Sequence, residues 1–181
     1  MKVIKAKTAG FCFGVKRAVD TVYKQVDTKC GQIYTYGPII HNEEVIKDMR
    51  DKGVIVLRSE EDLDMISQGT VIIRSHGVEK RIYEKIEQKG LRIVDATCPF
   101  VKKIHNIVSE KSGEGFHIII IGNPEHPEVV GIKGWAKDNV TVIQSAEDAE
   151  CFTADRKEKI CIVSQTTFNY NKFKELVEII S

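Results

Sequence analysis

The chain has 181 residues, 42% of them hydrophobic and 29% charged, so it can bury a substantial core in one large or two small domains. Its 27 Lys and Arg residues balance 26 Asp and Glu residues, and a net charge of +1 provides no overall field that attracts nucleic acid or membranes. No apolar run reaches the length of a membrane span and no segment resembles a secretory signal. We therefore expect a cytoplasmic protein with no nucleic-acid or membrane partner.

Short β-branched runs alternate with amphipathic stretches along the chain, which predicts α/β structure with parallel strands. In chain order, the predicted strands cover residues 3–6, 32–36, 54–57, 71–73, 92–94, 117–121, 140–143 and 160–163. Helical spacing is clearest over residues 15–26, 42–52, 79–89, 101–111 and 170–180. Gly53 and Gly90 follow two of these helices as expected C-caps.

Two cysteines, Cys12 and Cys98, begin near-copies of one pattern, Cys-Phe-Gly-Val-Lys-Arg and Cys-Pro-Phe-Val-Lys-Lys. Each is expected at the start of a helix, where the helix dipole and the basic residues favour the thiolate that binds metal or attacks an electrophile. The repeat predicts two similar α/β units, residues 1–97 and 98–181. Without a Cys-x-x-Cys knuckle, these thiols suit an iron–sulfur cluster better than structural zinc, although two sulfurs cannot complete a cubane cluster.

The other three cysteines carry no such motif. Cys161 lies in an apolar run and is expected to pack in the core, and we assign no role to Cys30 or Cys151. The wide, irregular spacing of the five cysteines argues against a secreted disulfide framework.

Polar clusters follow four predicted strands, in the order Ile40-His41-Asn42, Arg74-Ser75-His76-Gly77, Glu125-His126-Pro127-Glu128 and Ser164-Gln165-Thr166-Thr167. Ligands of parallel sheets bind outside the carboxyl ends of the strands, so these clusters and the two thiols could converge on one site. The chain contains neither a phosphate-binding loop of the G-x-x-x-x-G-K-[ST] type nor a G-x-G-x-x-G motif, which argues against ATP and NAD as ligands.

Three histidines, His41, His76 and His126, occupy turns after strands, where they could bind a metal, shuttle protons or contact an anion. His105 and His117 lie in a predicted helix and at a strand start, where we expect surface or hydrogen-bonded residues.

Two further side chains have two open interpretations each. Glu128 beside His126 could act as a general acid, or it could simply favour the first turn of a helix. Thr166 could orient a substrate hydroxyl, or its cluster could cap the last helix.

Six motifs together resemble the 4-hydroxy-3-methylbut-2-enyl diphosphate reductases, the LytB family, over the whole chain. They are Gly10-Phe-Cys-Phe-Gly-Val15, Ile40-His-Asn42, Ser75-His-Gly-Val78, Asp95-Ala-Thr-Cys-Pro99, His126-Pro-Glu-Val129 and Ser164-Gln-Thr-Thr167. The resemblance implies three small parallel-sheet α/β units in pseudo-threefold arrangement, two of them present here. They would surround an oxygen-sensitive [4Fe–4S] cluster held by three cysteines, and Cys12 and Cys98 match two of these ligands.

The resemblance also implies an enzyme of the non-mevalonate isoprenoid pathway, supplied with electrons by a ferredoxin or flavodoxin. It would remove the allylic hydroxyl of its small diphosphate substrate and give isopentenyl and dimethylallyl diphosphates. In such an enzyme His41, His76 and His126 line the diphosphate and proton-delivery side. Glu128 would be the proton donor, and Thr166 would hold the substrate near its hydroxyl.

Family members continue for roughly another domain, which carries the third cluster cysteine and a Ser-Ser-Asn-type diphosphate site. We therefore expect a fragment or truncated gene product, with residues 1–13 pairing with the third unit and with a labile cluster and poor turnover in this chain alone. Two alternatives remain: a non-catalytic iron–sulfur or metal carrier or redox sensor, and a structural α/β interaction module.

Overall fold

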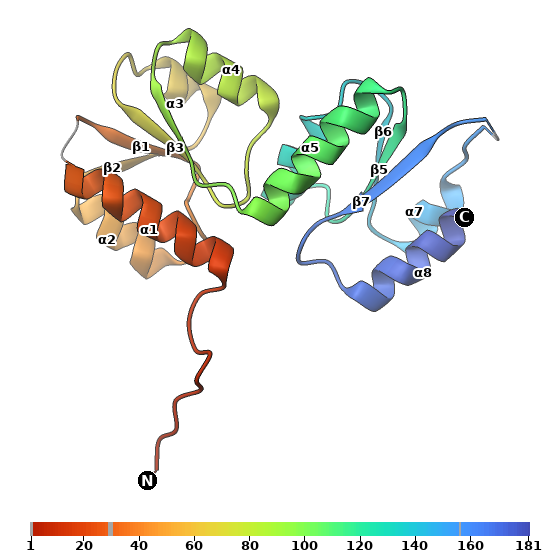
Figure 1. The fold of residues 1–181 in the computed structure, drawn as a ribbon, viewed down its shortest axis with the longest axis horizontal. Helices are drawn as coiled ribbons and strands as arrows, with labels where there is room; N and C mark the ends of the chain where they lie inside the picture. The colour runs from red at the N-terminus through yellow and green to blue at the C-terminus, as the bar shows by residue number, and fades with distance from the viewer. Residues whose placement is uncertain (1, 29–30, 156) are drawn as a thin grey trace.

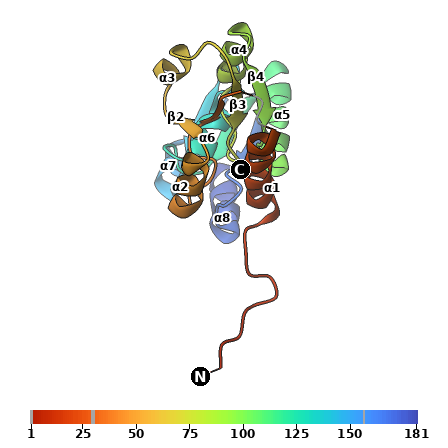
Figure 2. The same cartoon turned by 90° about the vertical axis from the view of Figure 1, so that its left-hand side faces the viewer.

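A computed structural model describes residues 2–28, 31–155 and 157–181 and confirms the parallel α/β architecture. Two separate sheets lie side by side, and each is covered by helices on both faces (Figure 1). The N-terminal segment before the first helix extends away from both sheets, as the view turned by 90° also shows (Figure 2).

The first sheet has four parallel strands in the order β2-β1-β3-β4. The strands are β1 (Ile33–Tyr36), β2 (Val54–Leu57), β3 (Thr70–Ile73) and β4 (Arg92–Asp95). The central strand β3 is buried along its whole length, as expected for an apolar strand of a sheet covered on both faces. The last residues of the four strands lie at the same level, so the loops that follow them leave from one edge.

Helices α1 (Phe13–Thr28) and α2 (Glu43–Asp51) pack on one face of this sheet, and α3 (Glu60–Asp64) and α4 (Lys80–Gln88) pack on the other. In α4, Ile82 and Ile86 are four residues apart and therefore face the sheet together. Gly53 and Gly90 follow α2 and α4 with positive φ and donate to carbonyls of the last helical turn, which confirms them as capping residues.

The second sheet has three parallel strands in the order β6-β5-β7. The strands are β5 (His117–Ile121), β6 (Val140–Ile143) and β7 (Ile160–Ser164). Four consecutive isoleucines make β5 the buried centre of this unit. Helices α5 (Pro99–Gly113) and α6 (Pro127–Lys133) cover one face, and α7 (Ala146–Cys151) and α8 (Tyr170–Ile180) cover the other.

The predicted strand at residues 3–6 is wrong. These residues form no strand, and Val3 and Ile4 are 81% and 78% exposed. A strand is stabilised by a partner that pairs its backbone N–H and C=O groups, and this segment joins neither sheet. Helices α3, α6 and α7 were not predicted, because five to seven residues are too few to display a clear helical period.

The two sheets meet at the loop between β3 and α4. The indole of Trp135 donates from Nε1 to the carbonyl of Val78 at 2.9 Å, and the N–H of Lys80 donates to Gly134 at 3.4 Å. The chain passes from the first sheet to the second between β4 and α5, near the expected boundary at residue 97. That residues 1–97 and 98–181 are separate domains stays a prediction, as does the pairing of residues 1–13 with a third unit.

None of the helices in the described ranges is both long and apolar enough to cross a membrane.

Candidate functional site

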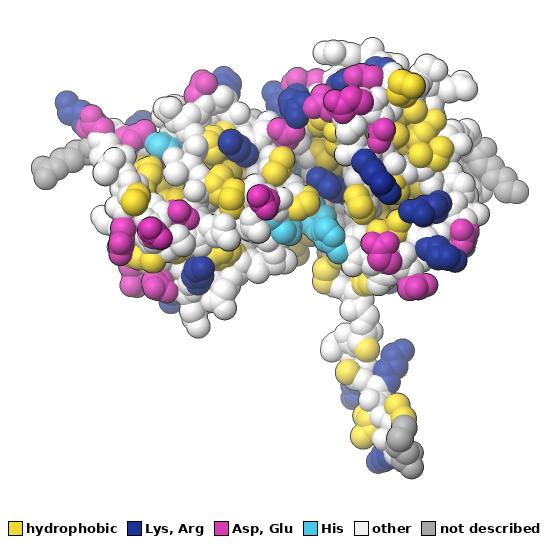
Figure 3. Space-filling model, turned by 180° about the vertical axis from the view of Figure 1, so that it is seen from behind, with side chains coloured by type: hydrophobic (Ala, Val, Ile, Leu, Met, Phe, Trp, Pro, Cys, Tyr) yellow, Lys and Arg dark blue, Asp and Glu magenta, His cyan; other side chains and the backbone are white. Residues whose placement is uncertain are grey.

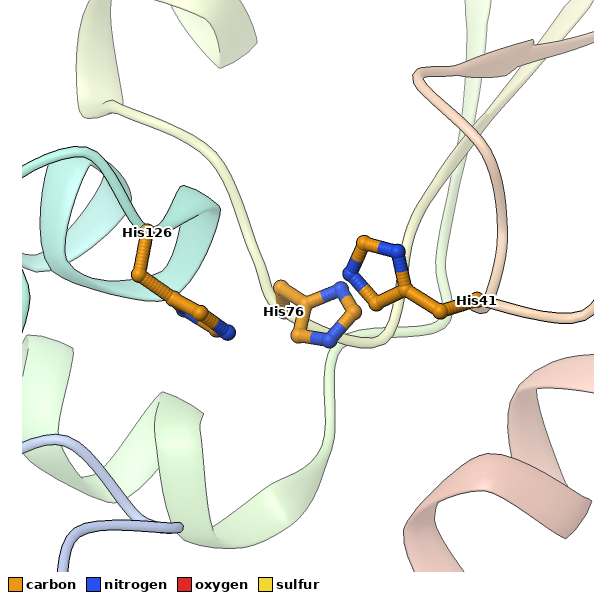
Figure 4. Close-up of side chains that lie close together, drawn as sticks. All are labelled: His41, His76 and His126. Atoms are coloured by element: carbon orange, nitrogen blue, oxygen red, sulfur yellow. The ribbon is translucent and has the colours of Figure 1, made fainter.

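Three imidazoles meet where the two sheets adjoin. His41 follows β1, His76 follows β3 and His126 follows β5, so each is carried by the loop that leaves the carboxyl end of a strand. Their rings point toward one another across the junction (Figure 4), and a group of histidine side chains is visible at the waist of the molecule (Figure 3). The ring centroids lie 4.9 to 6.5 Å apart, and one nitrogen from each ring lies within 4.8 Å of the others. The structure therefore brings together three histidines that are far apart in sequence.

Burial keeps two of these rings neutral. It lowers the pKa of His76 to about 4, and the neighbouring side chains of His41, Arg74 and His126 act in the same direction. The pKa of His126 is also lowered, again mainly by burial. At neutral pH these two imidazoles are therefore uncharged and each carries one N–H donor.

His126 is held as a donor toward the cluster. It is the N-cap of α6, and its Nδ1 accepts the backbone N–H of Glu128 at 3.1 Å. A neutral imidazole that accepts at Nδ1 carries its proton on Nε2, which then donates. A metal ion needs a lone pair on that nitrogen, whereas an anion needs its N–H, so the cap favours an anion over a metal.

Glu128 is 2% exposed, and its carboxyl binds one residue of the loop after β7. The backbone N–H of Thr166 donates to Oε1 at 2.6 Å, and the Thr166 hydroxyl donates to Oε2 at 2.9 Å. The alternative that the Thr166 cluster caps the last helix is wrong, because Asn169 is the N-cap of α8. Glu128 does lie in the first turn of α6, but its side chain is committed to Thr166.

The two cysteines of the repeated pattern lie at matching positions of their helices. The carbonyl of Cys12 accepts the N–H of Lys16, and the carbonyl of Cys98 accepts the N–H of Lys102, both at 2.9 Å. Each cysteine therefore precedes the first helical turn, as predicted. Cys12 is exposed and Cys98 is half-buried.

The two helix starts lie against each other. A Cβ on Gly14 would approach Sγ of Cys98 to 2.5 Å, so a larger residue at this position would require the side chain of Cys98 to move. Arg17 also reaches from α1 to the carbonyl of Thr97, which its guanidinium contacts at 2.7 Å. Both contacts bring the Cys12 turn next to the Cys98 turn.

Asp95 stabilises the turn that carries Cys98. Its carboxylate accepts the backbone N–H of Thr97 at 3.0 Å and the ammonium of Lys102 at 2.6 Å. Burial would raise the pKa of Asp95, but the hydrogen bonds from Lys102 and Thr97 outweigh it and lower the pKa. The backbone N–H of Cys98 donates to the carbonyl of Ser75 at 2.8 Å, one residue before His76.

The remaining histidines differ from each other. His117 is bonded through Nδ1 to Glu158 and through Nε2 to Thr141, as expected for a structural residue. The same expectation is wrong for His105, which is 1% exposed, stacks on Trp135 and has no hydrogen-bond partner at Nε2 within the described residues. Its ring packs against Gly77, where a Cβ would approach Cε1 to 2.4 Å.

The other cysteines take no part in this arrangement. Cys161 packs against the core of the second unit, as predicted, although it is only partly buried. Cys151 is exposed at the end of α7, and Cys30 lies outside the described residues.

The sequence assigned no role to two residues of this site, although both lie in motifs quoted above. Gly14 belongs to a quoted motif, but no local pattern indicates that it faces Cys98. Arg74 directly precedes Ser75 and His76, and its side chain packs over Gly37, with Nε donating to the carbonyl of Gly77 at 3.4 Å. The signal for Arg74 was a basic residue at the end of an apolar strand.

Comparison with known proteins identifies the family. The sequence profile of the family described as LytB protein matches residues 3–181. The chain belongs to the LytB family.

LytB relatives cover almost all of this chain. A protein of Thermoanaerobacter sp. (strain X514) named 4-hydroxy-3-methylbut-2-enyl diphosphate reductase is 47% identical over 182 residues, which is 99% of this chain and 62% of the relative. The protein with the same name from Clostridioides difficile (strain 630) is 42% identical over 100% of this chain and 64% of its own length. The chain thus spans less than two thirds of these LytB proteins.

Solved structures of LytB reductases share the fold. The E-1-hydroxy-2-methyl-but-2-enyl-4-diphosphate reductase of Plasmodium falciparum matches with a TM-score of 0.89 and 30% identity, over 96% of this chain and 54% of that one. A second structure, described as (E)-4-hydroxy-3-methyl-but-2-enyl diphosphate reductase, the terminal enzyme of the non-mevalonate pathway, matches with a TM-score of 0.81. It is 38% identical over 98% of this chain and 63% of that one.

Proposed function

We propose that this chain forms part of a reductase that converts 4-hydroxy-3-methylbut-2-enyl diphosphate into isopentenyl and dimethylallyl diphosphates. Its membership of a family whose relatives bear that name supports the proposal. The observation that carries it is the hydrogen bond from Cys98 to Ser75, because this bond joins the thiol turn to the loop of His76. This contact supports a redox group and an anion site at one edge of the fold.

The diphosphate binds at the three histidines. His41, His76 and His126 lie close enough together to share one polyanion, and the fixed N–H of His126 matches its oxygen acceptors. A carrier or redox sensor that used only the thiols would have no need of this cluster. The histidine geometry therefore favours the enzyme over that alternative.

The two cysteines of the site could supply two of the ligands of an iron–sulfur cluster. Cys12 and Cys98 offer soft thiolate donors at adjacent helix starts, and the absence of a side chain at Gly14 lets the start of α1 lie against Cys98. These two residues would hold a [4Fe–4S] cluster together with a third ligand. When bound, such a cluster supplies electrons and a Lewis-acidic iron.

Neither Cys151 nor Cys161 suits the role of third ligand. Cys161 lies near the start of β7, about 16 Å along the chain from Thr166, and it faces the core. Cys151 ends a helix that runs back from the carboxyl edge of the second sheet. The third thiolate is therefore assigned to neither of them.

Glu128 and Thr166 handle the substrate hydroxyl. The Thr166 hydroxyl donates to Glu128, so its oxygen accepts from the hydroxyl of the substrate, and Glu128, once protonated, delivers a proton to the oxygen that leaves. The electrons come from a small redox protein such as a ferredoxin or flavodoxin.

Iron binding tests the ligand assignment. The parent, Cys12→Ser, Cys98→Ser and Cys151→Ser are reconstituted with iron and sulfide without oxygen, and iron per chain and visible absorbance are measured after desalting. We expect both Cys12→Ser and Cys98→Ser to retain several-fold less iron than the parent, with Cys151→Ser unchanged as the matched control. Equal iron in all four proteins would show that these thiols hold no cluster.

A further inference from the structure

The imidazole cluster has donors but little fixed positive charge. His76 and His126 are neutral at neutral pH, because burial lowers the pKa of both. Neutral N–H groups orient an anion but do not balance its charge, and the carboxyl of Glu128 adds a negative charge beside His126. A diphosphate bound among these rings therefore requires a cation from elsewhere in the site.

Arg74 lies between two of the loops that carry the histidines. It follows β3, two residues before His76, and its side chain crosses Gly37 in the loop that leads from β1 to His41. A Cβ on Gly37 would approach Nη1 of Arg74 to 2.6 Å, and the φ of Gly37 is +72°. On its other side, Nε donates to the carbonyl of Gly77. The guanidinium thus occupies space that is open because Gly37 has no side chain.

No carboxylate of the described ranges forms an ion pair with Arg74. Arg81, in the helix that follows, instead contacts both Glu60 and Glu79. Burial lowers the pKa of Arg74, yet a guanidinium stays protonated at any physiological pH. A half-buried cation without a carboxylate partner favours an anion that can approach it.

The charge of Arg74 acts on the cluster itself. It disfavours protonation of both His76 and His126, which places its field at both rings. The guanidinium of Arg74 is held in place over Gly37 and by its bond to Gly77. Its charge is not balanced by a carboxylate of the described residues.

We propose that Arg74 is the charged anchor of the anion site, where its guanidinium balances the diphosphate while the three imidazoles direct their N–H groups at the oxygens. This inference rests on the proposed function, because it takes a diphosphate as the ligand of the cluster. It assigns the electrostatic part of binding to Arg74, a residue of the His76 cluster that has no role assigned from the sequence.

Calorimetric titration with inorganic pyrophosphate at pH 7.5 and low salt tests the role of Arg74. The proteins compared are the parent, Arg74→Met, Arg74→Gln, Arg74→Lys and His76→Ala, with Arg50→Met as the control for the same change of net charge at an exposed site on α2. We expect Arg74→Met and Arg74→Gln to bind at least about tenfold more weakly than the parent. Arg74→Lys keeps the charge and should recover most of the affinity, and Arg50→Met should bind like the parent.

The outcomes separate this inference from the function on which it rests. If Arg74→Gln binds pyrophosphate as tightly as the parent while His76→Ala does not, the proposed role of Arg74 is wrong and the diphosphate site at the histidines is supported. If the parent does not bind pyrophosphate, or if His76→Ala binds it equally well, the diphosphate site fails and the anchor fails with it. Arg74→Gln keeps an amide that can donate to Gly77, so it gives the result even where Arg74→Met does not fold.

Discussion

At the scale of single residues, the buried carboxyl of Glu128 should contribute to stability, because it accepts two hydrogen bonds from Thr166. Glu128→Gln can keep both bonds, since the Thr166 hydroxyl can accept from the new amide. We expect its free energy of unfolding within about 1 kcal/mol of the parent, whereas Glu128→Leu leaves the Thr166 N–H without an acceptor and costs about 1–3 kcal/mol. Urea denaturation measures both, with the exposed Glu125→Gln as the control. Equal stability of the Leu and Gln variants would contradict the role of these bonds.

His105 should make the fold sensitive to acid. Burial lowers its pKa to about 4; Asp95 opposes this shift and Lys102 adds to it. The unfolded chain binds the proton near pH 6.5 and the native state does not, so the free energy of unfolding falls as the pH drops from 6.5 toward 4. The contribution of this ring is about 3 kcal/mol in total.

The matched variant is His105→Phe, which keeps an aromatic ring beside Trp135 and removes the titrating group. Urea denaturation at pH 7 and pH 4.5 should show a smaller loss of stability for the variant than for the parent. His76 titrates in both proteins and therefore cancels in the comparison. The same loss in both would mean that His105 does not carry the effect.

The sequence predicts residues of this site better than their contacts. His41, His76 and His126 are recognisable because each follows an apolar strand, and the structure brings them together. The contact between Gly14 and Cys98 has no local signal, because it joins residues that are far apart in sequence and depends on how two helices approach. The same holds for the partner of Glu128.

At the scale of elements, the approach of α1 to α5 can be tested through Gly14. Gly14→Ala should destabilise the protein, because the new Cβ would meet Sγ of Cys98 at 2.5 Å. In a Cys98→Gly background that obstacle is gone, and the same substitution should instead stabilise the helix by up to about 1 kcal/mol. Thermal denaturation of the four proteins gives the coupling energy. Additive effects would show that the two helix starts are not in contact.

Elements with strong periodicity were predicted and isolated or short ones were not. Strands β3 and β5 are apolar runs that are buried on both faces, and the other five strands contain β-branched or aromatic residues that indicate them although they are only partly buried. Residues 3–6 have the same composition, but strand formation depends on a neighbour that local sequence does not reveal. Helix α6 spans only seven residues, yet it carries His126 as its cap and Glu128 in its first turn.

At the scale of the whole molecule, the junction between the sheets should unfold together with them. Val78 and Lys80, which follow β3, are bonded there to Trp135 and Gly134, which follow α6, so opening the junction would break contacts of both units. Trp135 is the single tryptophan of the chain and lies in this junction. Its fluorescence and the far-ultraviolet circular dichroism should therefore change at the same urea concentration. A fluorescence midpoint well below the other would mean that the junction separates first.

Helix α5 connects Cys98 to the loop that carries His76. Cys98 precedes its first turn and His105 lies about two turns later, where the ring presses on the glycine beside His76. Helix α5 therefore links the Cys98 thiol at its start to the loop of His76, which packs against its side. A ligand bound to the Cys98 sulfur, or oxidation of that sulfur, would displace α5 and with it the contact between His105 and the loop that carries His76. Under the proposed function, oxidation of the Cys98 thiol should therefore weaken the binding of pyrophosphate.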